Sequence, residues 1–196
     1  MKINTVRVFA VACTLLSASL AGAANIILGT GPDVSYLVLE SPNIGSRTYE
    51  IYYTYSTGSP LDTWGLLQIV DSAESDLSIS AGNFGTAQEP NYFISAITWL
   101  GVTETTTGAP TYAPYWVQSV AGGLAGYPTG VPVAEGSWSE GSGVSAPFRE
   151  IAPGSWDGLV YGAYGDVPSV NPVPEPVASV MVFMGSALLL LRRRAR

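Results

Sequence analysis

The most constraining feature of the sequence is an uncharged, apolar stretch at residues 177–191, close to the carboxyl end. A stretch with no polar face has no stable place on the surface of a water-soluble domain. A membrane span usually needs about 17–25 residues, but the stems of flanking arginines lengthen the reach of a shorter one. We therefore predict a transmembrane helix over residues 177–191, with a buried terminal helix as the less favoured alternative.

Both flanks of this stretch carry targeting information. Before it stand Pro174, Glu175 and Pro176, and the two prolines hold the residues that precede them in an extended conformation that a protease can read. After it comes an arginine-rich end, which the positive-inside rule places in the cytoplasm and which we predict to act as the membrane stop. The arginines of this stop are Arg192, Arg193, Arg194 and Arg196.

The order of Pro-Glu-Pro, a short apolar segment and an arginine-rich end resembles the PEP-CTERM sorting signal of exported proteins in Gram-negative bacteria. The resemblance covers Val173–Arg196. It implies that an exosortase, a membrane enzyme, recognises the motif and cleaves near it. It also implies a chain that is first tethered to the inner membrane with a cytoplasmic carboxyl terminus. After processing, such a chain reaches the cell surface or the extracellular matrix, where exopolysaccharide is a candidate partner.

The amino-terminal segment 1–23 has the pattern of a secretory signal peptide. Two cations precede a short apolar core, and Ala21 and Ala23 complete a small-residue cleavage site. We predict a signal helix that signal peptidase removes after Ala23. An uncleaved membrane anchor is the alternative, and the shortness of the apolar core disfavours it.

Residues 24–173 between the two targeting segments are strongly acidic. They contain two cations, Arg47 and Arg149, against fourteen carboxylates, so their formal net charge is −12. This field repels phosphate backbones, and we expect no nucleic acid as a partner. The absence of lysine, histidine and cysteine from these residues excludes the usual Ser-His and Cys-His catalysis and removes the common ligands of zinc and copper. We therefore expect no cofactor.

The pattern of the same region predicts an α+β fold, mainly antiparallel β with a single helix, over residues 24–164. Residues 47–56 alternate with period two and predict a strand that forms a hairpin with residues 34–40. The helix is predicted over residues 61–74, with Ser59 as its cap. Further strands are predicted at 25–29, 92–100, 115–120 and 156–164, and a short one near Trp138; 76–80 fits a strand or a loop, 82–85 turns, 103–114 a loop, and 165–173 a linker.

A second resemblance concerns the order of these elements. The helix sequence Leu61–Val70, the strand Tyr115–Val120 and the closing segment Pro153–Tyr161 are similar to the small carboxyl-terminal domain of transcobalamin. That family pairs a central helix with a Tyr-Trp strand, so the resemblance implies a compact, mostly β domain with one helix. It places no cobalamin-contacting residue in this chain.

Two kinds of side chain remain as candidates for function. A pair of acids in the late half of the domain could serve as the acid and base of a glycosidase, and these acids are Glu135, Glu140, Glu150 and Asp157. Aromatic rings stack on sugars, although we expect most rings here to fill a small β core. The rings are Tyr49, Tyr52, Tyr53, Tyr55, Trp99, Tyr112, Tyr115, Trp116, Trp138, Trp156, Tyr161 and Tyr164.

Three hypotheses for the function follow, in order of preference. The first is a non-catalytic structural or adhesive role at the cell surface, the second a module that binds a glycan or a small ligand, and the third a hydrolase of polysaccharide. An exposed aromatic patch would favour binding. Two carboxyl groups about 5–10 Å apart in a cleft would favour hydrolysis.

Overall fold

A computed structural model of the protein describes residues 25–108, 111–126 and 130–173. These residues form twelve strands and one helix, which confirms the predicted α+β class with mainly antiparallel strands and a single helix. No helix in these three ranges is long and apolar enough to cross a membrane. The predicted signal peptide, the sorting motif, the predicted transmembrane helix and the terminal arginines lie outside the described residues.

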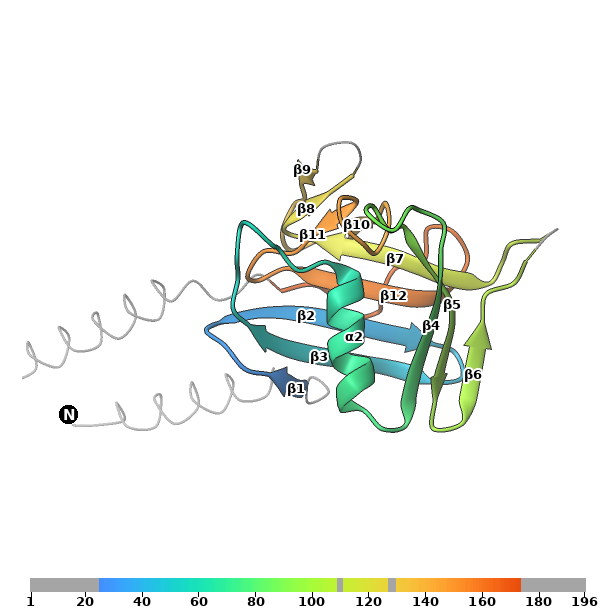
Figure 1. The fold of residues 1–196 in the computed structure, drawn as a ribbon. Helices are drawn as coiled ribbons and strands as arrows, with labels where there is room; N and C mark the ends of the chain where they lie inside the picture. The colour runs from blue at the N-terminus through green and yellow to red at the C-terminus, as the bar shows by residue number, and fades with distance from the viewer. Residues whose placement is uncertain (1–24, 109–110, 127–129, 174–196) are drawn as a thin grey trace, which may run out of the picture.

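The elements keep the labels of Figure 1. They are β1 (Ile26–Gly29), β2 (Asp33–Ser41), β3 (Gly45–Tyr53), α2 (Thr63–Ala73), β4 (Leu77–Asn83), β5 (Tyr92–Trp99), β6 (Val102–Thr105), β7 (Tyr115–Ala121), β8 (Leu124–Ala125), β9 (Val131–Pro132), β10 (Ser139–Glu140), β11 (Arg149–Glu150) and β12 (Trp156–Gly162).

The main sheet has six strands in the order β1-β3-β2-β12-β7-β10. The predicted hairpin of β2 and β3 is confirmed, with Asp33 opposite Tyr53 and Ser41 opposite Gly45. Two neighbouring pairs are parallel, β1 with β3 and β12 with β2. The second of these pairs joins the early and late parts of the chain at the centre of the sheet, where Tyr36 lies opposite Trp156.

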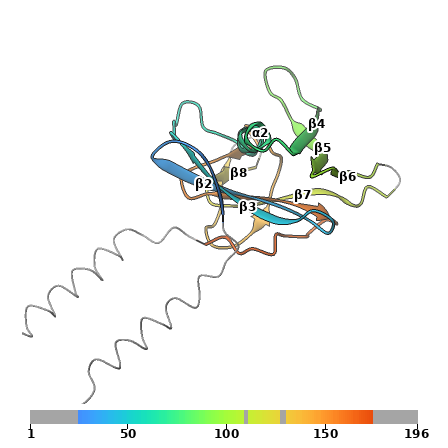
Figure 2. The ribbon, with the colours of Figure 1, turned by 90° about the horizontal axis from the view of Figure 1, so that it is seen from below.

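Helix α2 packs across one face of this sheet (Figures 1 and 2). The alternation predicted for β3 is confirmed on this side, since Tyr49 and Ile51 are fully buried and belong to the same core cluster as the helix. The fully buried apolar residues that the helix contributes to this cluster are Leu66, Leu67 and Val70. Removing apolar side chains from water on this scale is the main favourable term for such a fold.

The helix begins two residues later than predicted, and Asp62 caps it instead of Ser59. The Asp62 Oδ1 atom accepts a hydrogen bond from the Gly65 backbone N–H at 2.7 Å. Its Oδ2 atom accepts a second one from the Ala146 N–H at 2.8 Å. The carbonyl of Leu61 accepts from the Ile151 N–H instead of starting the helix. Tertiary contacts from a distant loop therefore decide where the helix starts.

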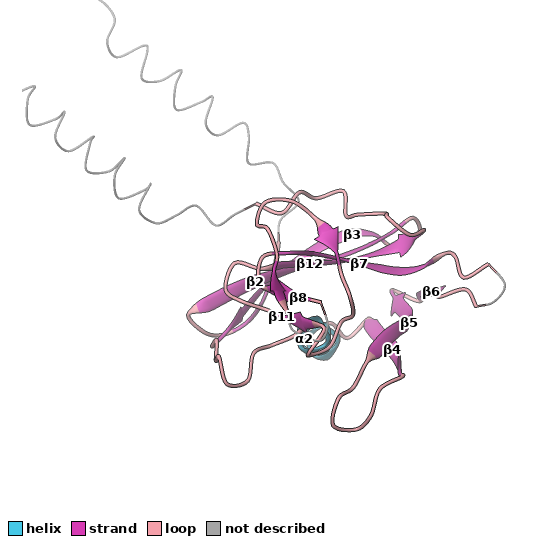
Figure 3. Ribbon diagram, turned by 90° about the horizontal axis from the view of Figure 1, so that it is seen from above, coloured by secondary structure: helices cyan, strands magenta, loops and turns pink. Residues whose placement is uncertain are grey.

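A second sheet, β4-β5-β6, stands beside the helix (Figure 3). A third sheet, β11-β8-β9, lies beyond β7 at the top of Figure 1. For residues 76–80 the sequence allowed a strand or a loop, and the structure has a strand there, because β4 begins at Leu77. The turn predicted at Gly82 and Asn83 is wrong, because both residues still pair with β5. The loop predicted over 103–114 is wrong at its start, since β6 continues the sheet and buries Glu104. That carboxylate accepts hydrogen bonds from Ser41 and Asn43 side chains, which compensates its burial.

The opposite face of the main sheet is also covered. Val38, Ala121 and Trp156 form a second buried cluster there, on the side away from the helix. The segment 165–173, which the sequence indicates as a linker, runs across this face, and Val170 packs against the cluster. The centre of the main sheet is therefore buried on both sides.

One polar atom of the core lacks a partner within the described residues: the hydroxyl of Tyr49. Burial raises the pKa of Tyr49 to about 12, with a further rise from Glu74 and an opposing effect of Arg47. An unfolded tyrosine ionises near pH 10. The unfolded chain therefore releases this proton before the folded chain does, and stability falls as the pH rises from about 10 toward 12.

We expect Tyr49→Phe to raise the free energy of unfolding by about 1 kcal/mol at neutral pH, because it removes a buried hydroxyl that has no partner. The loss of stability above about pH 10 should also become shallower. Urea unfolding followed by tryptophan fluorescence, at neutral pH and again above about pH 10, measures both effects. Tyr112→Phe, at a ring that is 64% exposed, is the matched control and should change neither quantity. Equal alkaline losses in Tyr49→Phe and the parent chain would contradict this account.

Candidate functional site

The four acidic residues singled out from the sequence take different places in the structure, and none of them lines the two pockets described below. Asp157 is fully buried and forms an ion pair with Arg149, with 2.7 Å between Oδ2 and Nη2. Glu140 is exposed and accepts a hydrogen bond from the Tyr164 hydroxyl at 2.6 Å. Glu135 is exposed in a loop, and Glu150 is half-buried on β11. The structure therefore gives Asp157 a packing role and leaves the other three at or near the surface.

The Arg149 guanidinium has a full set of hydrogen-bond acceptors although it is completely buried. Besides Asp157, its Nη1 atom donates to the carbonyls of Gly122 at 2.6 Å and Leu124 at 3.2 Å. Its Nε atom donates to Asp157 Oδ1 at 3.0 Å. Removing one partner of a buried ion pair strongly lowers the free energy of unfolding, because the other charge stays buried without a counter-ion. This pair therefore holds β11, β8 and β12 together, and separating these strands would leave a buried charge without a partner.

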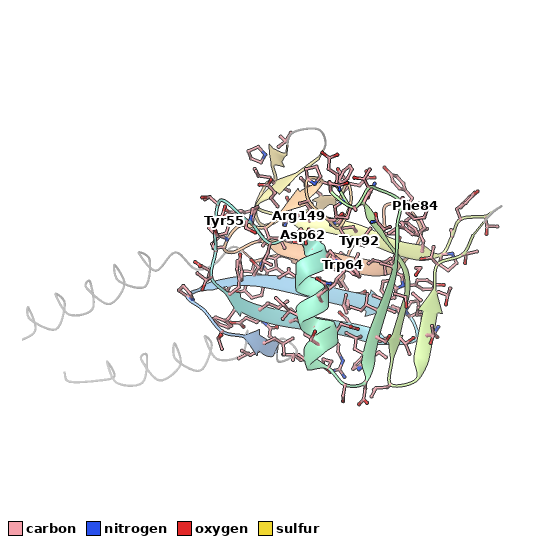
Figure 4. The ribbon with its side chains drawn as sticks, in the orientation of Figure 1. Tyr55, Asp62, Trp64, Phe84, Tyr92 and Arg149 are labelled. Atoms are coloured by element: carbon pink, nitrogen blue, oxygen red, sulfur yellow. The ribbon has the colours of Figure 1, made fainter. Side chains whose placement is uncertain are left out.

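A chain of hydrogen bonds runs from this ion pair to the surface. Thr63, the first residue of α2, donates to Asp157 Oδ1 at 2.5 Å. The amide nitrogen of Gln118 on β7 donates to Thr63 Oγ1 at 2.9 Å, and its oxygen accepts from the Gly143 N–H at 3.0 Å. Figure 4 shows Arg149 and Asp62 close to the first turn of the helix. The loop that contains Gly143 is thereby fixed to the core.

Two further contacts hold the same loop. The backbone N–H of Trp64 donates to the Val144 carbonyl at 2.8 Å. The Asp62 carboxylate accepts from the Ala146 backbone N–H, as described above. Burial raises the pKa of Asp62, and the hydrogen bonds from Ala146 and Gly65 partly oppose this rise. The loop over residues 141–146 is thus a preorganised wall.

A pocket of about 340 Å³ opens against this wall. It lies between the loop, β7 and the end of the β4–β5 hairpin. Its polar groups include the side chains of Asn91, Gln118 and Ser142, and its aromatic groups include Phe84, Tyr92 and Phe93. A concave surface of rings with a few placed amides and hydroxyls is the usual form of a small-ligand site.

The aromatic side of the pocket is open to solvent. Phe84 is 79% exposed and Phe93 is 40% exposed, and their ring centroids lie 6.2 Å apart in an edge-to-face arrangement. Tyr92 is held from behind, because its ring stacks on Trp64 with centroids 4.5 Å apart. Figure 4 shows these two rings beside the first turn of α2, with Phe84 farther out on the hairpin.

A second pocket, of about 440 Å³, lies on the other side of Phe93. Thr106, Thr107, Tyr112 and Tyr115 line it together with that ring. Among the described residues no charged side chain lines either pocket. We call the two pockets and the shared ring the aromatic cleft. Burial raises the pKa of Tyr115, and nearby Glu140 and Asp166 raise it further, so the surroundings of the cleft are anionic.

Sequence reasoning identified part of this cleft and missed the rest. Tyr112 and Tyr115 stand among the rings considered, but most others, including Tyr49 and Trp99, fill the core as expected. Three rings of the first pocket, Phe84, Tyr92 and Phe93, were missed as candidates for binding. The available signal was Phe84 within the Gly-rich run 82–85, where a ring has little chance of burial. The described residues include no group of histidine, cysteine or acidic side chains that could hold a metal ion.

Comparison of the chain with protein-family models, with curated proteins and with solved structures finds no match.

We expect Asp157→Asn to lower the free energy of unfolding by about 3–5 kcal/mol, because it leaves the Arg149 charge buried without a counter-ion. Adding Arg149→Met to this variant should cost less than the sum of the two single changes, since the unpaired charge disappears. Chemical unfolding of the three variants measures this. Glu150→Gln, a half-buried neighbour on β11, should stay within about 0.5 kcal/mol of the parent. A similarly small loss for Asp157→Asn would show that the ion pair contributes little.

Proposed function

We propose that the chain is an exported cell-surface or extracellular-matrix protein and that its domain binds neutral glycan in the aromatic cleft. In this proposal the adhesive role expected from the sequence is carried out through sugar binding, without catalysis. The observation that supports this proposal most is the exposed pair Phe84 and Phe93. Both rings line the first pocket and Phe93 also lines the second, and among the described residues no charged side chain lines either pocket.

The chemistry of the cleft favours carbohydrate over other ligands. Sugar rings present apolar C–H faces that pack on aromatic rings, and equatorial hydroxyls that hydrogen-bond to amides and hydroxyls. The cleft offers both, with Asn91 and Ser142 in one pocket and Thr106 and Thr107 in the other. Two adjoining pockets also suit a ligand longer than one sugar unit.

Charge favours a neutral glycan over an acidic one. Residues 24–173 have a formal net charge of −12, and Glu140 and Asp166 act on Tyr115 at the rim of the cleft. A uronate or phosphate group would be repelled there, and among the described residues neither pocket offers an arginine or lysine to pair with it.

Export and sorting rest on the sequence. The predicted signal peptide at 1–23, the motif Pro174-Glu175-Pro176 and the apolar segment 177–191 stand in the order of a PEP-CTERM protein. We propose that signal peptidase and an exosortase process the chain and that the inner membrane holds it in between. The acidity of the domain suits a protein that must stay dissolved outside the cell.

A non-catalytic role is favoured by the chemistry of the candidate acids. The chain has no histidine, and none of the four candidate acids lines the aromatic cleft. The one that is buried, Asp157, already pairs with Arg149. A glycosidase needs two free carboxyl groups facing one bound sugar.

We expect Phe84→Ala and Phe93→Ala each to weaken binding of a neutral glycan by at least about tenfold, which is 1.4 kcal/mol. Each change removes a stacking face without touching the core. Retardation in native gels that contain neutral or acidic polysaccharides, followed by calorimetry with oligosaccharides of the retarding type, measures the effect. Tyr164→Ala is the matched control, because this ring is 72% exposed but lines neither pocket.

The outcomes of this experiment separate the hypotheses. Retardation by a neutral polysaccharide that both phenylalanine variants lose supports the proposal. Retardation only by acidic polysaccharides would contradict the charge argument. If no polysaccharide retards the parent chain and sedimentation shows a dimer that Phe93→Ala dissociates, the rings serve contact between copies and the glycan proposal is wrong.

We expect alanine replacement of Pro174, Glu175 and Pro176 to leave uncleaved protein in the envelope, because the stiff motif is lost. Gel mobility of the protein from cell fractions after a pulse of labelling measures this. Neutral replacement of Arg192, Arg193 and Arg194 is the companion variant, and it should impair membrane retention before cleavage. Normal processing of the alanine variant would contradict the role of the motif.

A further inference from the structure

The segment 165–173 is part of the folded domain and is held by specific contacts. After β12 the chain reverses in a turn in which the Asp166 side chain accepts from the Ala163 N–H at 2.7 Å and the Asp166 N–H donates to the Ala163 carbonyl at 3.1 Å. The chain then runs back over the face of the main sheet opposite α2. We call residues 166–173 the strap.

Three aromatic rings form the groove that receives the strap. Tyr36 on β2 stacks on Trp156 on β12, with centroids 4.2 Å apart. Trp138 meets Trp156 edge-on at 6.4 Å. Each indole N–H donates to a strap carbonyl, Trp138 to Val170 at 2.8 Å and Trp156 to Val173 at 3.2 Å. The two tryptophans thus hold the backbone of the strap as well as its side chains.

The prolines of the strap are held in the folded domain as well. Pro168 and Pro172 are buried. Pro168 sits over Gly158, where an added Cβ atom would lie 2.3 Å from the Pro168 Cγ atom, so only glycine leaves room for this ring. Ser169 is fixed by its N–H and its hydroxyl, which both donate to Glu40 Oε2, at 3.0 Å and 2.8 Å.

This arrangement matches the chemistry by which proteins bind proline-rich peptides. Such peptides are extended, lack internal hydrogen bonds and repeat every three residues, so carbonyls three residues apart point to one side. Aromatic-lined grooves take the proline rings, and indole N–H groups take the carbonyls. The two carbonyls bound here, those of Val170 and Val173, have that spacing.

We propose that the groove of Tyr36, Trp138 and Trp156 is a binding site for the chain's own proline-containing segment, and that its occupancy limits processing at the sorting motif. The inference rests on the proposed sorting function. The strap ends at Val173, directly before Pro174. A protease takes several residues on each side of the cut in extended form, and residues 170–173 cannot enter an active site while the groove holds them. Processing therefore requires that the strap leaves the groove, and its rate follows the population of that open form.

Two kinds of variant of the full chain test the inference. Gly158→Ala places a methyl group against Pro168 and should displace the strap, and Trp138→Phe removes the hydrogen bond to Val170 while keeping a ring. A flexible Gly/Ser insertion between Val173 and Pro174 leaves the groove filled but gives the protease free chain. Gly58→Ala is the matched control, because an added Cβ atom there meets nothing within 4 Å.

Processing is followed by pulse labelling in cells that carry the exosortase, and strap docking by hydrogen exchange at the Ser169 amide of the purified chain. We expect all three test variants to be processed at least threefold faster than the parent. Exchange should be faster in Gly158→Ala and Trp138→Phe but unchanged in the insertion variant. Gly58→Ala should match the parent in both measurements.

The failure of this inference is distinguishable from that of the proposed sorting function. If the insertion leaves the processing rate unchanged while the alanine variant of the motif blocks processing, the motif works but the strap does not limit it, and the inference is overturned. The insertion variant tests the inference even if Gly158→Ala fails to fold, because the insertion does not alter the groove. If the alanine variant of the motif is processed normally, the sorting function itself is wrong.

Discussion

The buried ion pair between Arg149 and Asp157 is the interaction on which the rest of the domain depends. It lies where the short strands β8 and β11 meet the central strand β12, and the guanidinium also binds the carbonyls of Gly122 and Leu124. Through Thr63 the same carboxylate fixes the start of the helix. In a domain without disulfides or a described metal site, a pair whose separation leaves a buried charge is a strong constraint on the relative positions of these elements.

The shape of the aromatic cleft depends on this hydrogen-bond network. Gln118 bonds to Thr63 with one end and to Gly143 with the other, so the wall of the first pocket is tied to the ion pair through two hydrogen bonds. The opposite wall is a hairpin whose Tyr92 ring stacks on Trp64 of the helix. Because both walls are fixed before a ligand arrives, little conformational entropy remains to be lost on binding. A rigid site of this kind suits an uncharged ligand that has both apolar faces and hydroxyl groups, such as a neutral sugar.

The sequence allowed the strands and the helix to be predicted where periodicity was strong, as in the alternation around Tyr49 and the apolar stripe with Val70. It could not show that Asp62 caps the helix, because one of the cap's two partners, Ala146, comes from a distant loop. Nor could it show that Asp157 faces Arg149, since the amino-acid sequence does not distinguish a carboxylate in a buried ion pair from one that is solvated. Phe93 was missed for a similar reason. It lies in a run that reads as buried, and only the position of the hairpin leaves it 40% exposed.

The parallel pairing of β2 with β12 has a consequence for when the domain can form. Tyr36 near the beginning pairs with Trp156 near the end, so the middle of the sheet is missing until almost all of the domain is present. A chain that passes through a narrow channel amino end first therefore cannot complete its sheet on the way, because its last central strand has not yet emerged. Contacts this distant along the chain also form slowly. For the export that we propose, this topology means that the chain stays extended enough to pass through the channel and becomes compact only after its last central strand has emerged.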